Sequence, residues 1–186
     1  GENYSLQIQD LYSPTSNIDY KVVGLPNYIS NSTEFNLIGD DLNIKASGIH
    51  NISYRVDAGG WQNFSSPFTL SGYNHGMHTI YYYTTDNAGN EEVIHKEKIF
   101  LDIQAPNISI NSPKENQSFG QDSPNFNIEV SDINLDTIWY TLNHGQDMKI
   151  TNNGTIDQSR WEGLPDGIIG ITFFSNDSAA NIAQKS

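Results

Sequence analysis

The stretch His78-Thr79-Ile80-Tyr81-Tyr82-Tyr83-Thr84, followed by the run Asp86-Asn87-Ala88-Gly89-Asn90, decides the fold of this chain. Successive side chains of a β-strand point to opposite faces of a sheet, so Ile80 and Tyr82 are predicted to face a core. Tyr81 and Tyr83 then face away from it. Asp, Asn and Gly are typical of tight turns, because they bond the local backbone or accept a positive φ. The stretch therefore predicts a core strand that ends in a turn.

The same strand and turn recur 91 residues further along the chain. Tyr82 corresponds to Phe173, and the turn corresponds to Asp177-Ser178-Ala179-Ala180-Asn181. Phe35-Asn36-Leu37 likewise recurs as Phe126-Asn127-Ile128. Because a period of this length is a usual domain size, a chain of 186 residues is predicted to hold two domains. The predicted organisation is an N-terminal segment at 1–16, a first domain at 17–104 and a second domain at 105–186.

The remaining pattern is also that of strands. Short alternating stretches are separated by clusters of Gly, Pro, Asn and Asp, which predicts an all-β fold made of two tandem Ig-like β-sandwich domains. Hairpin turns are predicted at 57–60 and 143–145, where Gly and Asn accept positive φ. Trp61, Trp139 and Trp161 are predicted to anchor cores or hairpins. We expect strands at 18–23, 34–38, 49–56, 60–64, 68–70, 78–84 and 93–102, and in the second copy at 107–110, 125–130, 137–142, 148–150 and 170–175.

The charge balance excludes two classes of partner. Lys and Arg number 9 against 22 Asp and Glu, which gives a formal net charge of −13. Nucleic acids and anionic lipid surfaces bind through clustered Lys and Arg, so we expect neither as a partner. No apolar run approaches the roughly 20 residues that a membrane-spanning helix needs. The chain has no Cys, so disulfides give no information on its compartment.

N-linked glycosylation sequons of the form Asn-x-Ser/Thr are unusually frequent. Glycans at these positions would hold the asparagines at the surface of an extracellular or cell-surface protein, which is the location we predict. The alternative is a protein that is rich in Asn and turns and carries no glycan. The predicted acceptors are Asn3, Asn31, Asn51, Asn63, Asn107, Asn116, Asn153 and Asn176.

A resemblance to a known group of proteins emerges from the first copy. Ile52-Ser53-Tyr54-Arg55-Val56-Asp57, Gly59-Gly60-Trp61 and the Asp86–Asn90 turn resemble the Ig-like or fibronectin-III-like repeats of archaeal and bacterial cell-surface proteins. The resemblance implies an extracellular scaffold without catalytic residues. The second copy departs from it by having Ala180 where these repeats usually have Gly, so we expect a less permissive turn geometry there.

The residues offer no recognisable catalytic machinery. No nucleophile elbow or phosphate-binding loop is present, and we predict neither an enzyme nor a cofactor. His75 and His78 have ligand-like spacing, but the histidines are otherwise scattered, and we predict no metal site. Carboxylates at matching positions raise calcium as an alternative, although turn aspartates more simply accept backbone N–H bonds. These carboxylates are Asp40, Asp41, Asp86, Asp132, Asp136 and Asp177. A sugar-binding alternative draws on Tyr73, Tyr81, Tyr83 and Trp61.

The ends of the chain suggest how copies could associate. The first copy continues after its turn into a closing strand, whereas the second is expected to stop at Ser186 without one. The segment up to Asp10, followed by Pro14, resembles a spare closing strand. We therefore predict head-to-tail homopolymers formed by donor-strand complementation. The predicted donor residues are Tyr4, Leu6, Ile8 and Asp10. The predicted acceptor groove is formed by Ile171, Phe173 and Ser175. The alternative is a spacer cut from a longer tandem array.

Overall fold

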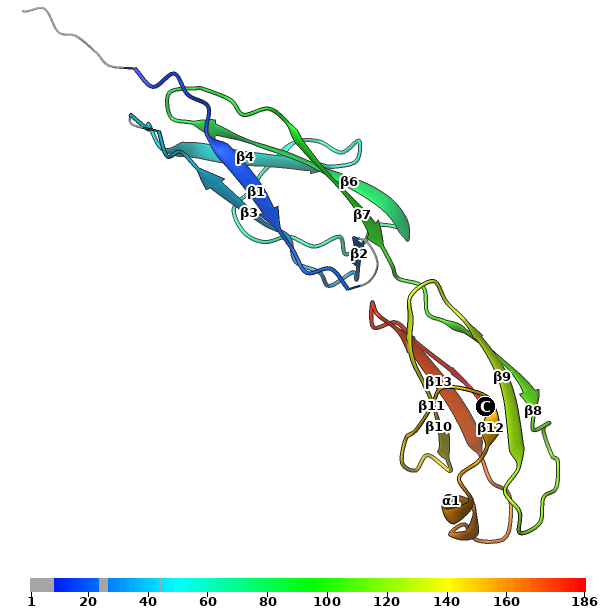
Figure 1. Ribbon diagram of the computed structural model, residues 1–186. Coiled ribbons are helices and arrows are strands. Elements are labelled where there is room, and N and C mark those ends of the chain that lie inside the picture. The colour runs from blue at the N-terminus through cyan, green and yellow to red at the C-terminus, as the bar shows by residue number, and fades with distance from the viewer. Residues whose placement is uncertain (1–8, 24–26, 44) are drawn as a thin grey trace, which may run out of the picture. The chain divides into compact units, whose positions relative to one another are not determined.

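The computed structural model describes residues 9–23, 27–43 and 45–186, and the chain divides into two compact units, Gly1–Asp102 and Ile103–Ser186 (Figure 1). Each unit is almost entirely β-structure, as the sequence predicts. Among the described residues, no helix is long and apolar enough to span a membrane.

The first unit is a sandwich of two sheets. One sheet pairs β1 with β3, and the other has the order β2-β7-β6-β4-β5. Leu37 of the first sheet and Ile80 and Tyr82 of the second belong to one buried cluster, so the core lies between the sheets. Its strands are β1 (Thr15–Asp19), β2 (Tyr28–Ile29), β3 (Asn36–Asp40), β4 (Ile49–Val56), β5 (Gln62–Asn63), β6 (Gly76–Asp86) and β7 (His95–Leu101).

The second unit has the same plan. One sheet has the order β11-β10-β13-β14 and the other β12-β9-β8, with Phe126, Tyr140 and Phe173 in the shared core. The predicted all-β sandwich architecture is thus confirmed in both units. Its elements are β8 (Asn107–Ser112), β9 (Asn125–Ser131), β10 (Leu135–Leu142), β11 (Met148–Ile150), β12 (Gly154–Thr155), α1 (Gln158–Glu162), β13 (Ile171–Asp177) and β14 (Ile182–Lys185).

The hairpin turns form as predicted. Asp57 has φ +51°, and the Gly59 N–H donates to the Val56 carbonyl at 2.9 Å. Asn143 and His144 also have positive φ, and the Gly145 N–H donates to the Leu142 carbonyl at 2.8 Å. Left-handed residues at these positions match the right-handed twist of the strands that they join.

Several details differ from the sequence prediction. The stretch predicted as a strand at 68–70 contributes only an isolated bridge between Phe35 and Phe68. The first strand lies at Thr15–Asp19 rather than at 18–23. The short helix α1 was not expected. It begins after Asp157, whose carboxylate accepts the Arg160 N–H at 3.0 Å and so caps the helix.

Candidate functional site

The predicted acceptor edge is already occupied over part of its length. Phe173 and Ser175 are fully buried on β13, as expected for core-facing positions. However, β14 pairs with β13 from Asn176↔Ile182 to Phe173↔Lys185. The expectation that no strand follows Asn181 is therefore wrong. Four residues suffice because the turn returns the chain directly beside β13, where its backbone groups complete the sheet.

The edge of β13 beyond β14 borders a groove. Ile171 pairs with Leu142 on one side, while the pairs with β14 begin only at Phe173. The adjoining groove has a volume of about 1320 Å³ and is lined in part by Ile110, Phe119, Trp161, Ile169, Ile171 and Lys185. Trp161 is fixed there because its indole N–H donates to the Gly120 carbonyl at 3.0 Å. Of the three predicted acceptor residues, Ile171 is the one that lines this groove, and an acceptor role there stays a prediction.

Of the predicted donor residues, the structure describes Asp10. Tyr4, Leu6 and Ile8 lie outside the described residues. Asp10 is described, and it is buried in its own unit, where its carboxylate accepts the Tyr12 N–H at 3.1 Å and the Ser47 N–H at 2.9 Å. The assignment of Asp10 to a donor strand is therefore wrong. Its carboxylate is held by backbone donors of the first unit, so any donated segment ends before it.

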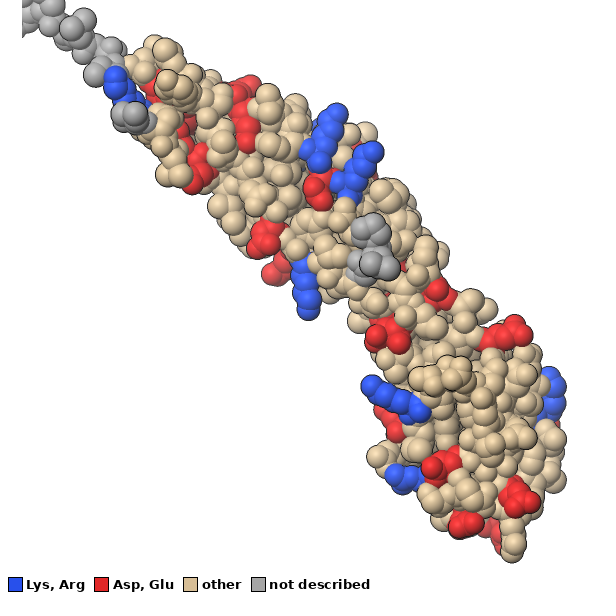
Figure 2. All heavy atoms as spheres, in the orientation of Figure 1, with Lys and Arg blue, Asp and Glu red and all other residues tan. Residues whose placement is uncertain are grey.

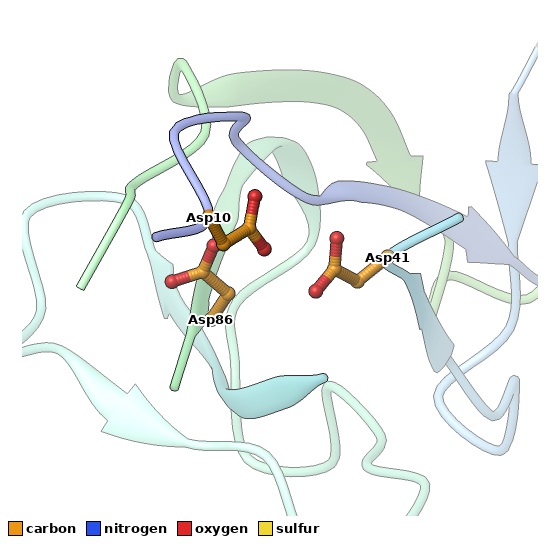
Figure 3. A group of neighbouring side chains, drawn as sticks. All are labelled: Asp10, Asp41 and Asp86. Carbon is orange, nitrogen blue, oxygen red and sulfur yellow. The ribbon is translucent and has the colours of Figure 1, made fainter. Parts of the chain in front are cut away.

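Asp10 instead belongs to an acidic cluster in the first unit. Carboxylate oxygens of Asp10, Asp41 and Asp86 lie within 4.8 Å of one another, and Figure 3 shows three segments distant in sequence bringing them together. Asp10 and Asp86 are buried, and Asp41 is half-buried. Oxygen ligands of this kind suit calcium. The sequence singled out Asp41 and Asp86 as candidate ligands but not Asp10.

Hydrogen bonds account for each carboxylate of the acidic cluster. Burial alone would raise the pKa of Asp86, but hydrogen bonds from the Asn90 side chain and backbone and from Ala88 outweigh burial and lower it. The backbone N–H of Tyr12 is the main cause that lowers the pKa of Asp10. Asp41 accepts the Gly48 N–H at 2.8 Å. The contacts of Asp86 therefore support the turn-forming role that we predicted for it, and we assign no ion.

The turn of the second unit reproduces these contacts. Asp177 accepts the Asn181 N–H and the Asn181 side-chain N–H, each at 2.8 Å, just as Asp86 accepts from Asn90. Ala180 has φ +67°, close to the left-handed conformation of Gly89 at +89°. The expectation of a less permissive geometry at Ala180 is therefore wrong. The Asp177 carboxylate holds the turn tightly enough to keep an alanine in a conformation that glycine prefers.

The two histidines with ligand-like spacing have separate partners. His78 Nδ1 lies 2.7 Å from the Asp57 carboxylate and Nε2 lies 2.7 Å from the Asn74 carbonyl. His75 instead faces the Asp102 carboxylate at 3.4 Å. Burial alone would lower the pKa of His78, but the hydrogen bonds to Asp57 and Asn74 outweigh it and raise the pKa above 6.5. Both ring nitrogens therefore act as donors, which suits a structural imidazolium.

The sequon asparagines divide into two groups. Of those described, Asn51 and Asn176 are half-buried, and both N–H bonds of each side-chain amide are donated within the protein. Asn3 lies outside the described residues. The other sequon asparagines are exposed, namely Asn31, Asn63, Asn107, Asn116 and Asn153.

The aromatic residues of the sugar-binding alternative do not all lie together. Trp61 and Tyr83 form an edge-to-face pair with ring centroids 4.9 Å apart, and Tyr81 lies on the same face of β6 as Tyr83. Tyr73 instead packs edge-on against His78, whose side chain is buried.

Comparisons with known proteins found distant similarity to solved structures only. No protein-family model and no curated protein matches the chain. Among solved structures it is similar to the fibronectin(III)-like modules of Clostridium thermocellum CbhA, with a TM-score of 0.47 and 10% identity over 92% of this chain and 90% of that chain. It is also similar to the D00-D0 domain of intimin, with a TM-score of 0.35 and 12% identity over 92% of this chain and 96% of that chain. Likeness at this level carries no inference about activity or partner, and an archaeal source stays a prediction.

Proposed function

We propose that this chain is a non-catalytic structural module of an extracellular or cell-surface protein, in which Ig-like units carry N-linked glycans. The observation that supports this proposal is the position of the sequons. Five of the seven described acceptor asparagines are exposed. An exposed asparagine can carry a glycan without any loss of packing, and the glycan then solvates the surface.

Glycopeptide mass spectrometry of the native protein tests this proposal. We expect glycans on exposed asparagines such as Asn63 and Asn153. We expect none on Asn51 or Asn176, because a glycan replaces one N–H of an amide that already donates both. Unmodified asparagines throughout, together with failure to label the protein on intact cells with an impermeant reagent, would contradict the proposal.

In the finer form of the proposal, copies of the chain associate head to tail. The segment before Asp10 of one copy adds a strand beside Ile171 of the next copy and fills the groove there. Added strands satisfy backbone N–H and C=O groups and bury alternate side chains, so Leu6 and Ile8 face the groove while Gln7 and Gln9 face solvent. Because such a contact is heterologous and does not close, it generates filaments. The groove of about 1320 Å³ is the observation that supports this form.

A pair of matched double variants tests strand addition. Leu6→Asp/Ile8→Asp places two charges on the face that enters the groove, whereas Gln7→Asp/Gln9→Asp places the same charges on the opposite face. By sedimentation velocity and electron microscopy, we expect the first variant to be monomeric and the second to assemble like the parent chain. Equal assembly of all three proteins rules out this form of the proposal.

The rival form is a spacer in a longer tandem array, in which the same polypeptide supplies the strand beside Ile171. The mass of the intact native polypeptide separates the two. A mass near that of these 186 residues plus glycans favours head-to-tail assembly. A much larger mass favours the array. The structural role of the module is common to both forms.

A further inference from the structure

One face of the first unit gathers basic and aromatic side chains. On β4, β6 and β7, the core-facing positions include Ile80, Tyr82 and Ile99, so the alternate residues point to the outer face of this sheet. Register places Arg55 opposite Tyr81, and Tyr81 opposite Lys96. We call this surface the basic–aromatic face. It comprises Arg55, Trp61, Tyr81, Tyr83, Lys96 and Lys98.

The side chains of this face are held in contact with one another. The Arg55 guanidinium lies 4.4 Å from the Tyr81 ring centroid and 5.2 Å from that of Trp61. The Lys96 ammonium lies 5.7 Å from the Tyr81 ring on the neighbouring strand. Rings hold a cation by the attraction of their π faces, so Arg55 is oriented before any ligand arrives. Pre-oriented groups lose less conformational entropy on binding.

The cations of this face form no ion pair with a described carboxylate. The ion pairs of the described residues all involve histidine, and none involves Arg55, Lys96 or Lys98. Glu97, which lies between the two lysines in sequence, points the other way and accepts the Tyr20 hydroxyl at 2.6 Å. The face is therefore a local positive site on a chain whose net charge is −13. Figure 2 shows acidic and basic side chains spread over the visible surface of the chain.

We propose that the basic–aromatic face binds an anionic saccharide, that is, a glycan chain that carries carboxylate or sulfate groups. Trp61 is 42% exposed, and the exposed part of its ring would pack against the apolar face of a sugar. Lys96 and Lys98 are exposed and reach the acidic substituents, and Arg55 is positioned for a paired contact with one of them. This function goes beyond the structural role proposed above and does not depend on it.

The arrangement favours a saccharide over other anions. A nucleic acid presents about one charge per 1.7 Å of duplex, and its binding needs a larger basic patch than three side chains provide. An acidic peptide matches the cations but makes no particular use of the Trp61 ring. The negative charges elsewhere on the chain act weakly on a bound ligand, because salt screens exposed charges beyond about 8 Å at physiological ionic strength.

Binding to defined oligosaccharides tests the proposal on the full chain, produced without N-linked glycans so that no glycan on Asn63 covers the face. The probes are a hexasaccharide of galacturonate, a hexasaccharide of chondroitin sulfate and neutral maltohexaose, measured by calorimetry. We expect at least one acidic probe to bind and the neutral probe not to bind. The two acidic probes distinguish carboxylate from sulfate recognition. Absence of binding by both at millimolar concentration overturns the proposal.

Matched variants locate the site. Lys96→Gln/Lys98→Gln should weaken binding about fivefold or more, because two charge contacts are lost. Lys21→Gln/Lys45→Gln removes the same charge from exposed positions outside the face and should change binding by less than about twofold. Trp61→Ala should also weaken saccharide binding, with circular dichroism confirming the fold. Equal weakening by both lysine pairs overturns the proposal. It is also overturned if a hexaglutamate peptide binds as tightly as the saccharide and its affinity is unchanged by Trp61→Ala.

Discussion

Replacing Ala180 by glycine is expected to stabilise the second unit. The backbone at Ala180 has φ +67°, a left-handed conformation that costs an L-residue roughly 1–2 kcal/mol. The methyl group is exposed, so its removal sacrifices no packing. Glycine gives the unfolded chain more freedom, which costs about 0.4–1 kcal/mol. The net gain is therefore about 0–1.6 kcal/mol, and its central value near 0.8 kcal/mol corresponds to roughly 3–6 °C in the melting temperature of a unit of this size.

The first unit supplies the reciprocal control. Gly89 occupies the matching turn at φ +89°, and a Cβ placed there meets no atom within 4 Å. Gly89→Ala therefore tests the backbone conformation alone, and we expect a loss similar in size to the gain from Ala180→Gly. Urea denaturation measures the change in stability of each variant. Amide hydrogen exchange, measured separately for β6–β7 and for β13–β14, assigns that change to the first or the second unit. A neutral or destabilising Ala180→Gly alongside a destabilising Gly89→Ala would refute the reasoning.

Four further outcomes follow from the contacts. Because the pKa of His78 is raised, the stability that its protonated ring gives to the first unit is complete below pH 6.5 and is lost as pH rises through the folded pKa. The urea midpoint should therefore fall over this pH range, and His78→Gln should abolish the fall. The lowered pKa of Asp86 has the opposite effect on stability: the contribution of its carboxylate is present above pH 3.8 and is lost as pH falls through the folded pKa. Asp86→Asn should therefore reduce the fall of the urea midpoint at acid pH. Because the carboxylates of the acidic cluster already accept N–H donors, chelation should leave the melting temperature unchanged, and a drop of several degrees would instead reveal a bound cation. Phe173→Ala should cost about 3–5 kcal/mol, with loss of exchange protection confined to the second unit.

The parts of the fold that follow from the sequence are those that local alternation specifies. Tyr82 and Phe173 face the cores because residues two apart share a face, and this rule needs no knowledge of the rest of the chain. The short strand β14 was missed because four residues carry too little alternation to distinguish a strand from a tail. Its pairing is instead set by the Asp177–Asn181 turn, which directs the chain back beside β13.

The sites depend on contacts across the fold, which explains why the sequence predicted them only in part. Asp10 was grouped with a donor strand because its neighbours resemble the residues before Asp102. In the folded unit its carboxylate meets the Ser47 N–H, a contact between residues 37 positions apart that no local pattern encodes. Trp61 and Tyr83 were identified individually, but Arg55 was not, because its importance comes from the register that places it opposite Tyr81. A residue on an outward-facing strand position gains a binding role only through its neighbours on adjacent strands. For this reason the charge variants of the basic–aromatic face are a stronger test than substitution of any single aromatic residue in it.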